Sequence, residues 1–159
     1  MSEMETDLVH LERAIELAAA ARQHGNHPFG SLLVDADGQV VLEAENTVVT
    51  ARDVTGHAEL NLVREAGARF DPAQLAGCTL YTSTEPCAMC AGAIFWSGIG
   101  RVVFALSSAT LGTIVADPTG EWTLAMSCRD VFAEGGRETA VHGPLIEERA
   151  RVVHDGFWQ

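Results

Sequence analysis

Apolar residues near the start of the chain recur at spacings of three and four, which place them on one face of a helix. The residues that carry this pattern are Leu8, Leu11, Ile15 and Ala18. The sequence predicts that the helix ends near the segment HGNHP, whose glycine and proline interrupt it. The next segment, FGSLLVDADGQVVLEAEN, has two short apolar runs around Asp37-Gly38, a pair typical of hairpin turns. It predicts two short strands.

Segments typical of helices and strands then alternate along the chain. GHAELNLVREAG predicts a helix with Leu60, Val63 and Ala66 facing the core and Gly67 at its end. CTLYT and RVVFAL predict strands, and PCAMCAGAIFWSG between them predicts a helix that opens on Pro86. Residues 107–120, rich in Ser, Thr, Gly, Asp and Pro, predict a loop near the site. Three last segments predict a helix, a strand and a closing helix: EWTLAMSCRDVFAEGG, RETAVHG and PLIEERARVVHDGFWQ.

This alternation predicts an α/β fold, a three-layer α/β/α sandwich in which one mixed sheet carries helices on both faces. A chain of 159 residues has the length of one domain. It contains no internal repeat, linker or low-complexity segment. We therefore expect a single domain over residues 1–159.

The net charge is −12, from 22 acidic and 10 basic residues. Proteins that bind nucleic acid through phosphates usually present a basic surface, so nucleic acid is not the expected partner. The N-terminal segment lacks the basic region of a signal peptide, and no apolar run approaches the roughly 18 residues that span a bilayer. We expect a cytoplasmic location without membrane contact. In that reducing compartment, four cysteines indicate metal binding or catalysis before disulfides.

Cys87 and Cys90 are one helical turn apart, so both sulfur atoms can reach one ion. A helix N-terminus also favours thiolates. His57 begins the preceding predicted helix and can join them if the two helix starts converge at one end of the sheet. Catalytic zinc sites typically have three protein ligands and leave the fourth position to water. We expect these three residues to bind Zn²⁺.

Glu59 follows His57 by two residues and is expected to face the open position of the metal. A metal lowers the pKa of bound water from 15.7 to about 7, and a neighbouring carboxylate can carry the released proton to a substrate nitrogen. A metal-bound water beside a carboxylate suits the hydrolytic loss of ammonia from an amidine-like carbon. A thioredoxin-like redox pair and a structural all-thiolate zinc site are the alternatives, but this CxxC occurs once and late in the chain. The thiolate site would use Cys78, Cys87, Cys90 and Cys128.

The segments His57-Ala58-Glu59 and Pro86-Cys87-Ala88-Met89-Cys90 resemble the H-x-E and P-C-x-x-C signature of the zinc-dependent cytidine deaminase-like superfamily. The resemblance covers about the first two thirds of the chain and weakens after Leu106. It implies a five-stranded mixed sheet flanked by helices, zinc on the three named ligands, and Glu59 as the proton shuttle. The catalytic core would span about residues 5–107.

The resemblance also implies substrate contacts. Asn46 stands where the base-deaminase branch has an asparagine that hydrogen-bonds the ring edge of the substrate, and Phe29 in PFG resembles the guanine-deaminase version of that segment. Trp96, on the helix with the cysteines, is a candidate for lining the pocket or for packing. Phe157 and Trp158 are expected to cover the bound base as part of a C-terminal lid over about residues 144–159, or to pack against a dimer partner.

The resemblance favours deamination of a free nucleobase, guanine or cytosine or a related aminated heterocycle, by a homodimer. The alternative in the same superfamily is a tRNA adenosine deaminase, which the acidic charge disfavours. An inactive binding module is disfavoured because the ligand set and Glu59 are complete. Asp117 and Glu121 are candidates for reading a purine. The sequence does not distinguish guanine from cytosine.

Overall fold

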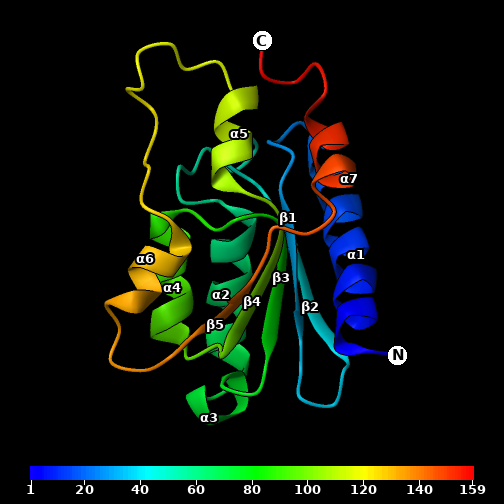
Figure 1. Ribbon diagram of the computed structural model, residues 1–159, viewed down its shortest axis with the longest axis vertical. Helices are drawn as coiled ribbons and strands as arrows, with labels where there is room; N and C mark the ends of the chain where they lie inside the picture. Colours follow the sequence, from blue (N-terminus) through cyan, green and yellow to red (C-terminus); the bar gives the residue numbers. More distant parts are fainter.

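A five-stranded mixed sheet forms the centre of the computed structural model, which describes residues 1–159 (Figure 1). Its strand order is β2-β1-β3-β4-β5. β1 (Gly30–Val34) pairs antiparallel with β2 (Val40–Glu45) and with β3 (Thr79–Thr84). β3, β4 (Arg101–Leu106) and β5 (Ala140–His142) run parallel to one another. Helices cover both faces, which confirms the predicted three-layer α/β/α sandwich.

One face of the sheet is covered by α1 (Glu3–Gln23) and α7 (Glu147–Arg151), with a 3₁₀ turn, η1 (Val152–His154), directly after α7. Of the four residues predicted on the inner face of α1, Leu8 is only partly buried. The other three are fully inside: Leu11, Ile15 and Ala18. They pack on apolar side chains of β1, β3 and β4, which form the core of this layer.

The opposite face is covered by α2 (Ala58–Arg69), α4 (Ala88–Ser97) and α6 (Cys128–Ala133). Phe104 of β4 is completely buried in the core of this layer. The short helix α3 (Pro72–Leu75) lies at one end of the molecule (Figure 1). None of the helices combines the length and the apolar character that a bilayer-spanning segment needs.

The hairpin predicted around Asp37-Gly38 is confirmed. Gly38 has a φ of +83°, a left-handed conformation that glycine adopts without steric penalty. The Asp35 carboxylate closes the turn by accepting hydrogen bonds from the backbone amides of Asp37 and Gln39, both at 2.9 Å. The turn therefore sets the register between β1 and β2.

The inner face of α2 agrees with the prediction only in part. Ala66 is fully buried as predicted, but Leu62 is the other fully buried residue, whereas Leu60 and Val63 are half-buried. Gly67 does not end the helix, because the chain continues helical to Arg69 and the Phe70 amide donates to the Ala66 carbonyl. The prediction was wrong because it took a glycine as a helix end where the backbone never becomes left-handed.

Residues 107–120 were predicted as a loop, but they contain α5 (Ser108–Ile114). The Ser107 hydroxyl accepts a hydrogen bond from the Thr110 amide at 3.1 Å, which is an N-cap interaction. The serine-rich composition that suggested a loop therefore includes the cap that starts a helix. Residues 115–127 form turns without helix or strand.

Candidate metal centre and active site

The residues predicted to bind metal come together at the starts of two helices. His57 is the N-cap residue of α2, Cys87 is the N-cap residue of α4, and Cys90 lies in the first turn of α4. Neither cap residue uses its side chain to cap its own helix, so both side chains are free to point toward each other. The helix starts converge because β2 and β3 both run antiparallel to β1, so the chain leaves both strands at the same end of the sheet before it enters α2 and α4 (Figure 1).

The distances within this group fit a zinc ion. The Nδ1 atom of His57 lies 3.5 Å from the sulfur of Cys87 and 3.5 Å from the sulfur of Cys90. A tetrahedral ion with Zn–S bonds of about 2.3 Å and Zn–N bonds of about 2.0 Å separates N and S ligand atoms by about 3.5 Å. The three ligand atoms all lie within 4.8 Å of one another. Geometry and donor type therefore match Zn²⁺.

The proximity of these groups also changes their pKa values. Hydrogen bonds from the Cys90 and His57 side chains lower the pKa of Cys87 to about 4, although burial opposes them. The hydrogen bond with Cys87, reinforced by burial, raises the pKa of Cys90. The hydrogen bond with Cys87 also raises the pKa of His57, against burial. One thiolate is thus available at neutral pH, and a bound cation favours the second because metal ligands are deprotonated.

Glu59 lies in the first turn of α2, and its side chain is 6% exposed. No other side chain donates a hydrogen bond to its carboxyl group, which lines a cavity beside the metal ligands. Burial, together with the nearby Cys87, raises the pKa of Glu59 to about 7. A cation at the cluster acts in the opposite direction. The carboxyl group is therefore placed and tuned to exchange protons with a molecule in the cavity.

The cavity has a volume of about 120 Å³, and nine residues line it: His27, Phe29, Asn46, His57, Glu59, Thr84, Glu85, Cys87 and Leu111. Larger hollows on the molecular surface contain none of the metal ligands. The lining combines aromatic and apolar walls with a few polar groups, as small-molecule sites usually do. The cavity and the metal ligands form one site.

Asn46 follows β2 and is 2% exposed. Its Oδ1 atom accepts a hydrogen bond from the Val48 amide at 3.0 Å, and its backbone amide donates to the Phe29 carbonyl at 3.1 Å. Its Nδ2 group has no partner in the protein. The side chain is thus held rigidly with a free donor, and the adjacent Phe29 ring forms a wall of the same cavity.

Phe157 and Trp158 lie after η1 and do not themselves line the cavity. They contact residues that do. The His27 ring centroid is 5.4 Å from that of Trp158 and 5.8 Å from that of Phe157. Phe29 is 6.1 Å from Trp158. The C-terminal aromatic residues therefore pack on the outer side of the cavity wall.

The structure does not bring Trp96 to the cavity. Its side chain is 83% exposed and lies beside α3, with its ring edge-to-face on Phe95 at 5.3 Å. Ile94, two positions earlier on α4, faces the core, so Trp96 points the other way. This placement supports neither alternative for Trp96, because the residue neither lines the cavity nor packs inside the protein.

The other candidates also lie apart from the site. Asp117 accepts hydrogen bonds from the Trp122 amide at 3.0 Å and the Thr123 hydroxyl at 2.7 Å, and neither Asp117 nor Glu121 lines the cavity. Cys78 and Cys128 are buried and free, and they are not part of the metal cluster. The all-thiolate alternative is therefore wrong.

Sequence patterns missed several cavity residues. Thr84 ends β3, Leu111 lies on the helix that was predicted as a loop, and His27 directly precedes the PFG segment. Glu85 directly precedes Pro86 of the P-C-x-x-C motif. Its carboxylate accepts from the Ser108 and Cys128 amides at 3.1 and 3.3 Å, so it ties the starts of α5 and α6 to the cavity. Position next to a recognised motif was the available signal for His27 and Glu85.

Residues 4–106 match the family model described as the cytidine and deoxycytidylate deaminase zinc-binding region. The chain belongs to this family. It is therefore a deaminase, and the His57, Cys87 and Cys90 cluster is suited to the zinc that this family binds.

Three curated relatives differ in what they act on. A probable cytosine deaminase of Schizosaccharomyces pombe is 45% identical over 97% of this chain and 93% of its own length. A guanine deaminase of Bacillus subtilis is 43% identical over 60% of this chain and 61% of its own length. A tRNA-specific adenosine deaminase of Haemophilus influenzae is 38% identical over 69% of this chain and 64% of its own length. The similarity to the first relative extends through the C-terminal region.

Among solved structures, the deaminase resembles the guanine deaminase from Nitrosomonas europaea. The TM-score is 0.75 at 26% identity, over 91% of this chain and 80% of that chain. The deaminase therefore shares the cytidine deaminase-like fold that the sequence motif implied.

Proposed function

We propose that this deaminase hydrolytically removes the exocyclic amino group of a free nucleobase, cytosine or guanine or a related aminated heterocycle, and releases ammonia. The observation that carries the proposal is the cavity of about 120 Å³ that contains Glu59 beside the metal ligands. Similarity to proteins named as cytosine and guanine deaminases supports it.

The size of the cavity favours a free base over a nucleoside or an RNA. Pockets for drug-sized ligands typically measure about 300–1,000 Å³, so a cavity of about 120 Å³ suits a single small heterocycle. A ribose attached to the base would have to extend out of the cavity through its wall. On the side of His27 and Phe29 that wall is covered by Phe157 and Trp158.

His57, Cys87 and Cys90 would hold the zinc, which supplies Lewis-acid chemistry and a water of lowered pKa when it is bound. Glu59 is the catalytic residue that moves two protons in turn. Its carboxylate takes the first from the attacking water and gives it to a ring nitrogen, then takes the second from the hydroxyl group added to the ring carbon and gives it to the amine, which leaves as ammonia. The free Nδ2 donor of Asn46 orients the base through an acceptor on its edge. The lining residues exclude water around this exchange.

We further propose that residues 1–159 act as a single domain, with a catalytic core over about residues 5–107 and a lid over about residues 144–159. Phe157 and Trp158 are the lid residues that close over the base, supported by their contacts with His27 and Phe29. Four free cysteines support a reducing compartment such as the cytoplasm.

A homodimer is the proposed assembly. The proposal is supported by the exposed Trp96 ring, which lies beside a hollow of mixed character lined by Pro72, Ala73 and Ala76 together with Arg137 and Glu138.

The test is ammonia release by purified, zinc-loaded protein offered cytosine, guanine, isocytosine, adenine, cytidine and guanosine in parallel. We expect turnover of one or two free bases and none of the nucleosides. Activity that disappears after chelation and returns with zinc assigns the reaction to this centre. Equal turnover of a base and its nucleoside, or silence on every free base, would overturn the proposal.

Editing of tRNA adenosine is the second candidate, favoured by the similarity to a tRNA-specific adenosine deaminase. A net charge of −12 opposes it, because RNA binding depends on neutralising phosphates. Adding tRNA to the same assay separates the two candidates. Inosine formation with no base turnover would establish the second one.

A further inference from the structure

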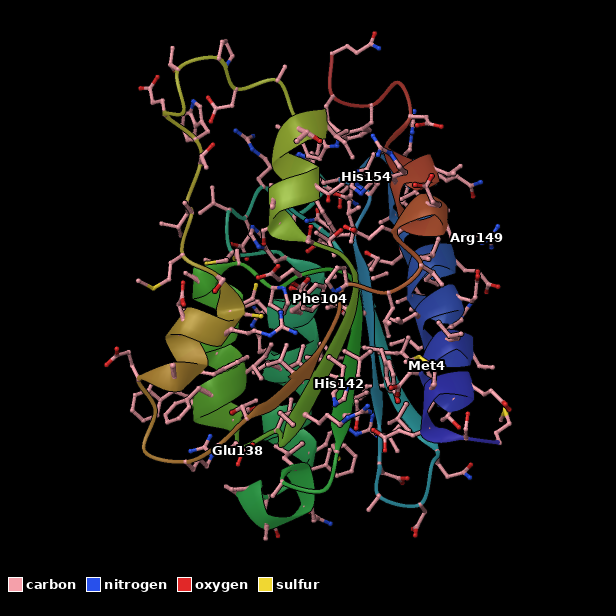
Figure 2. The ribbon with its side chains drawn as sticks, viewed as in Figure 1. Met4, Phe104, Glu138, His142, Arg149 and His154 are labelled. Atoms are coloured by element: carbon pink, nitrogen blue, oxygen red, sulfur yellow. The ribbon has the colours of Figure 1, made fainter.

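His154 is the last residue of η1, and the reaction proposed above does not use it. It is 2% exposed and lies at the end of the molecule that also carries α5 (Figure 2). Its Nδ1 atom accepts a hydrogen bond from the indole Nε1 of Trp158 at 2.9 Å. The two rings are stacked, with centroids 6.2 Å apart and planes 19° apart. Phe29, a cavity wall residue, also packs on His154, with the ring centroids 5.5 Å apart and the planes at 62°.

The hydrogen bond determines which tautomer His154 adopts. The indole nitrogen of tryptophan can only donate, so Nδ1 of His154 must carry no hydrogen and Nε2 must carry it. That Nε2 group is buried and has no hydrogen-bond partner. An unpaired buried N–H is destabilising, and a leucine of similar bulk would avoid this cost. Compared with a leucine, the His154 imidazole therefore contributes one favourable feature, the hydrogen-bond acceptor at Nδ1.

A second contact fixes the backbone of the same segment. Arg22 of α1 donates hydrogen bonds to the carbonyls of Val153 and Asp155 at 2.8 and 2.7 Å. Its guanidinium also lies 5.5 Å from the centre of the Phe157 ring. Arg22 thus holds the path of the chain, but it makes no contact that orients the Trp158 ring. Only the bond to His154 does so by a directional interaction.

The oriented ring meets the cavity wall. Trp158 lies 5.4 Å from His27 and 6.1 Å from Phe29, between ring centroids, and both of those residues line the cavity. We propose that His154 is a positioning residue, which holds the indole of Trp158 against the His27 and Phe29 wall through its Nδ1 acceptor and so keeps the C-terminal segment closed over the bound base. The consequence for substrate rests on the proposed function. The positioning itself does not.

Hydrogen exchange of the indole N–H groups tests the positioning without any substrate. Tryptophan labelled with ¹⁵N gives three indole signals, and Trp158→Phe identifies one of them. Trp96 and Trp122 are 83% and 89% exposed and serve as internal references. We expect the Trp158 signal to exchange most slowly. His154→Leu should speed its exchange about three- to tenfold, the range of one net hydrogen bond. His154→Asn should restore protection, because the asparagine Oδ1 can replace Nδ1 as acceptor.

Steady-state kinetics tests the consequence on the base found by the ammonia assay. His154→Leu should raise KM about three- to tenfold and change kcat less than twofold, with zinc content unchanged. Trp158→Phe, which removes the N–H donor and one of the two indole rings but keeps an aromatic side chain, should do the same. The double variant should add little further. Trp122→Phe makes the matching change at an exposed site and should leave KM unchanged.

Two results would overturn the inference: Trp158 exchange that does not respond to His154→Leu, or a KM equal to that of the wild type. If no free base is deaminated but the exchange result holds, the proposed function fails and the positioning by His154 stands. If a base is deaminated and the exchange does not respond, the proposed function stands and the positioning by His154 fails.

Discussion

Glu59 combines two properties that rarely occur together in a protein interior. It is 6% exposed, and no neighbouring side chain donates a hydrogen bond to its carboxyl group. Burial without a side-chain donor disfavours the charged carboxylate, so its position beside the metal ligands points to a role in proton transfer. The short spacing between His57 and Glu59 places the carboxyl group beside the metal site, because the start of one helix carries both the ligand and the acid–base group.

Glu59→Gln should lower kcat by about 10²–10⁴-fold, the usual contribution of a positioned acid–base group. The amide keeps the size of the side chain but cannot transfer the proton. Zinc content and thermal stability should remain close to wild type, because Glu59 is not one of the three clustered ligands. Metal analysis and steady-state assays on the same preparation check this. A variant with near wild-type kcat would remove Glu59 from the mechanism.

His154 makes a prediction about pH. Burial and the nearby Arg22 charge lower its pKa to about 4, while Asp155 acts in the opposite direction. In the unfolded chain the imidazole titrates near about 6.5, so between these values the unfolded state binds more protons. This part of the free energy of unfolding is therefore complete above about pH 6.5 and is lost as the pH falls toward 4.

Urea unfolding at pH 7 and pH 4.5 measures this difference. The wild type should lose more stability between the two values than His154→Leu, whose side chain does not titrate. Since every other titrating group is shared by the two proteins, their difference isolates His154. An identical loss in both would mean that the histidine keeps its ordinary pKa in the folded protein.

At the scale of elements, the site depends on how α2 and α4 begin. Their N-cap residues, His57 and Cys87, make no side-chain capping bond. α5 and α6 begin differently, because the Ser107 and Ser127 hydroxyls accept hydrogen bonds from their own first turns. A capping side chain contributes about 1 kcal/mol. A metal ion that fixes His57 and Cys87 would take over this role for these two helices.

Chelation should therefore loosen two helix starts selectively. Amide hydrogen exchange measured with and without a zinc chelator should rise about tenfold or more in residues 58–61 and 88–91. The first turns of α5 and α6 are the control, since serine caps them whether or not metal is present. Uniform exchange across all four helix starts would contradict the prediction.

The elements also show what a sequence can and cannot reveal. The alternation of patterns predicted the sandwich, and the spacing of His57, Cys87 and Cys90 predicted a cluster that the structure brings together. Composition failed at α5, because serine both breaks helices and caps them. The His154–Trp158 bond had no sequence signal, since it depends on a 3₁₀ turn and on the packing of Phe29. Local spacing is readable, whereas contacts set by tertiary packing are not.

At the scale of the whole molecule, the exposed aromatic residues are the candidates for contact between two copies of the chain. Trp96 and Trp122 are 83% and 89% exposed and lie on different segments. Trp96 belongs to a regular helix beside the hollow next to α3, whereas Trp122 lies in the irregular residues 115–127. An exposed aromatic ring on a regular helix is the better candidate for contact between two copies.

Trp96→Glu should shift the protein from dimer to monomer in sedimentation velocity, because a charge would be buried in the proposed interface. Trp122→Glu makes the same chemical change elsewhere and should leave the assembly unchanged. A wild-type protein that sediments as a monomer, or a Trp96→Glu variant that remains a dimer, would rule out this surface.

The uncapped starts of α2 and α4 have a consequence for how much of the protein a cell keeps. Without metal these turns open first, and they expose the chain around His57 and Cys87 to proteases. Locally opened segments are where degradation begins, and small losses of stability can change abundance severalfold. The level of this deaminase in a starved cell would then follow the supply of zinc as well as the rate of its synthesis.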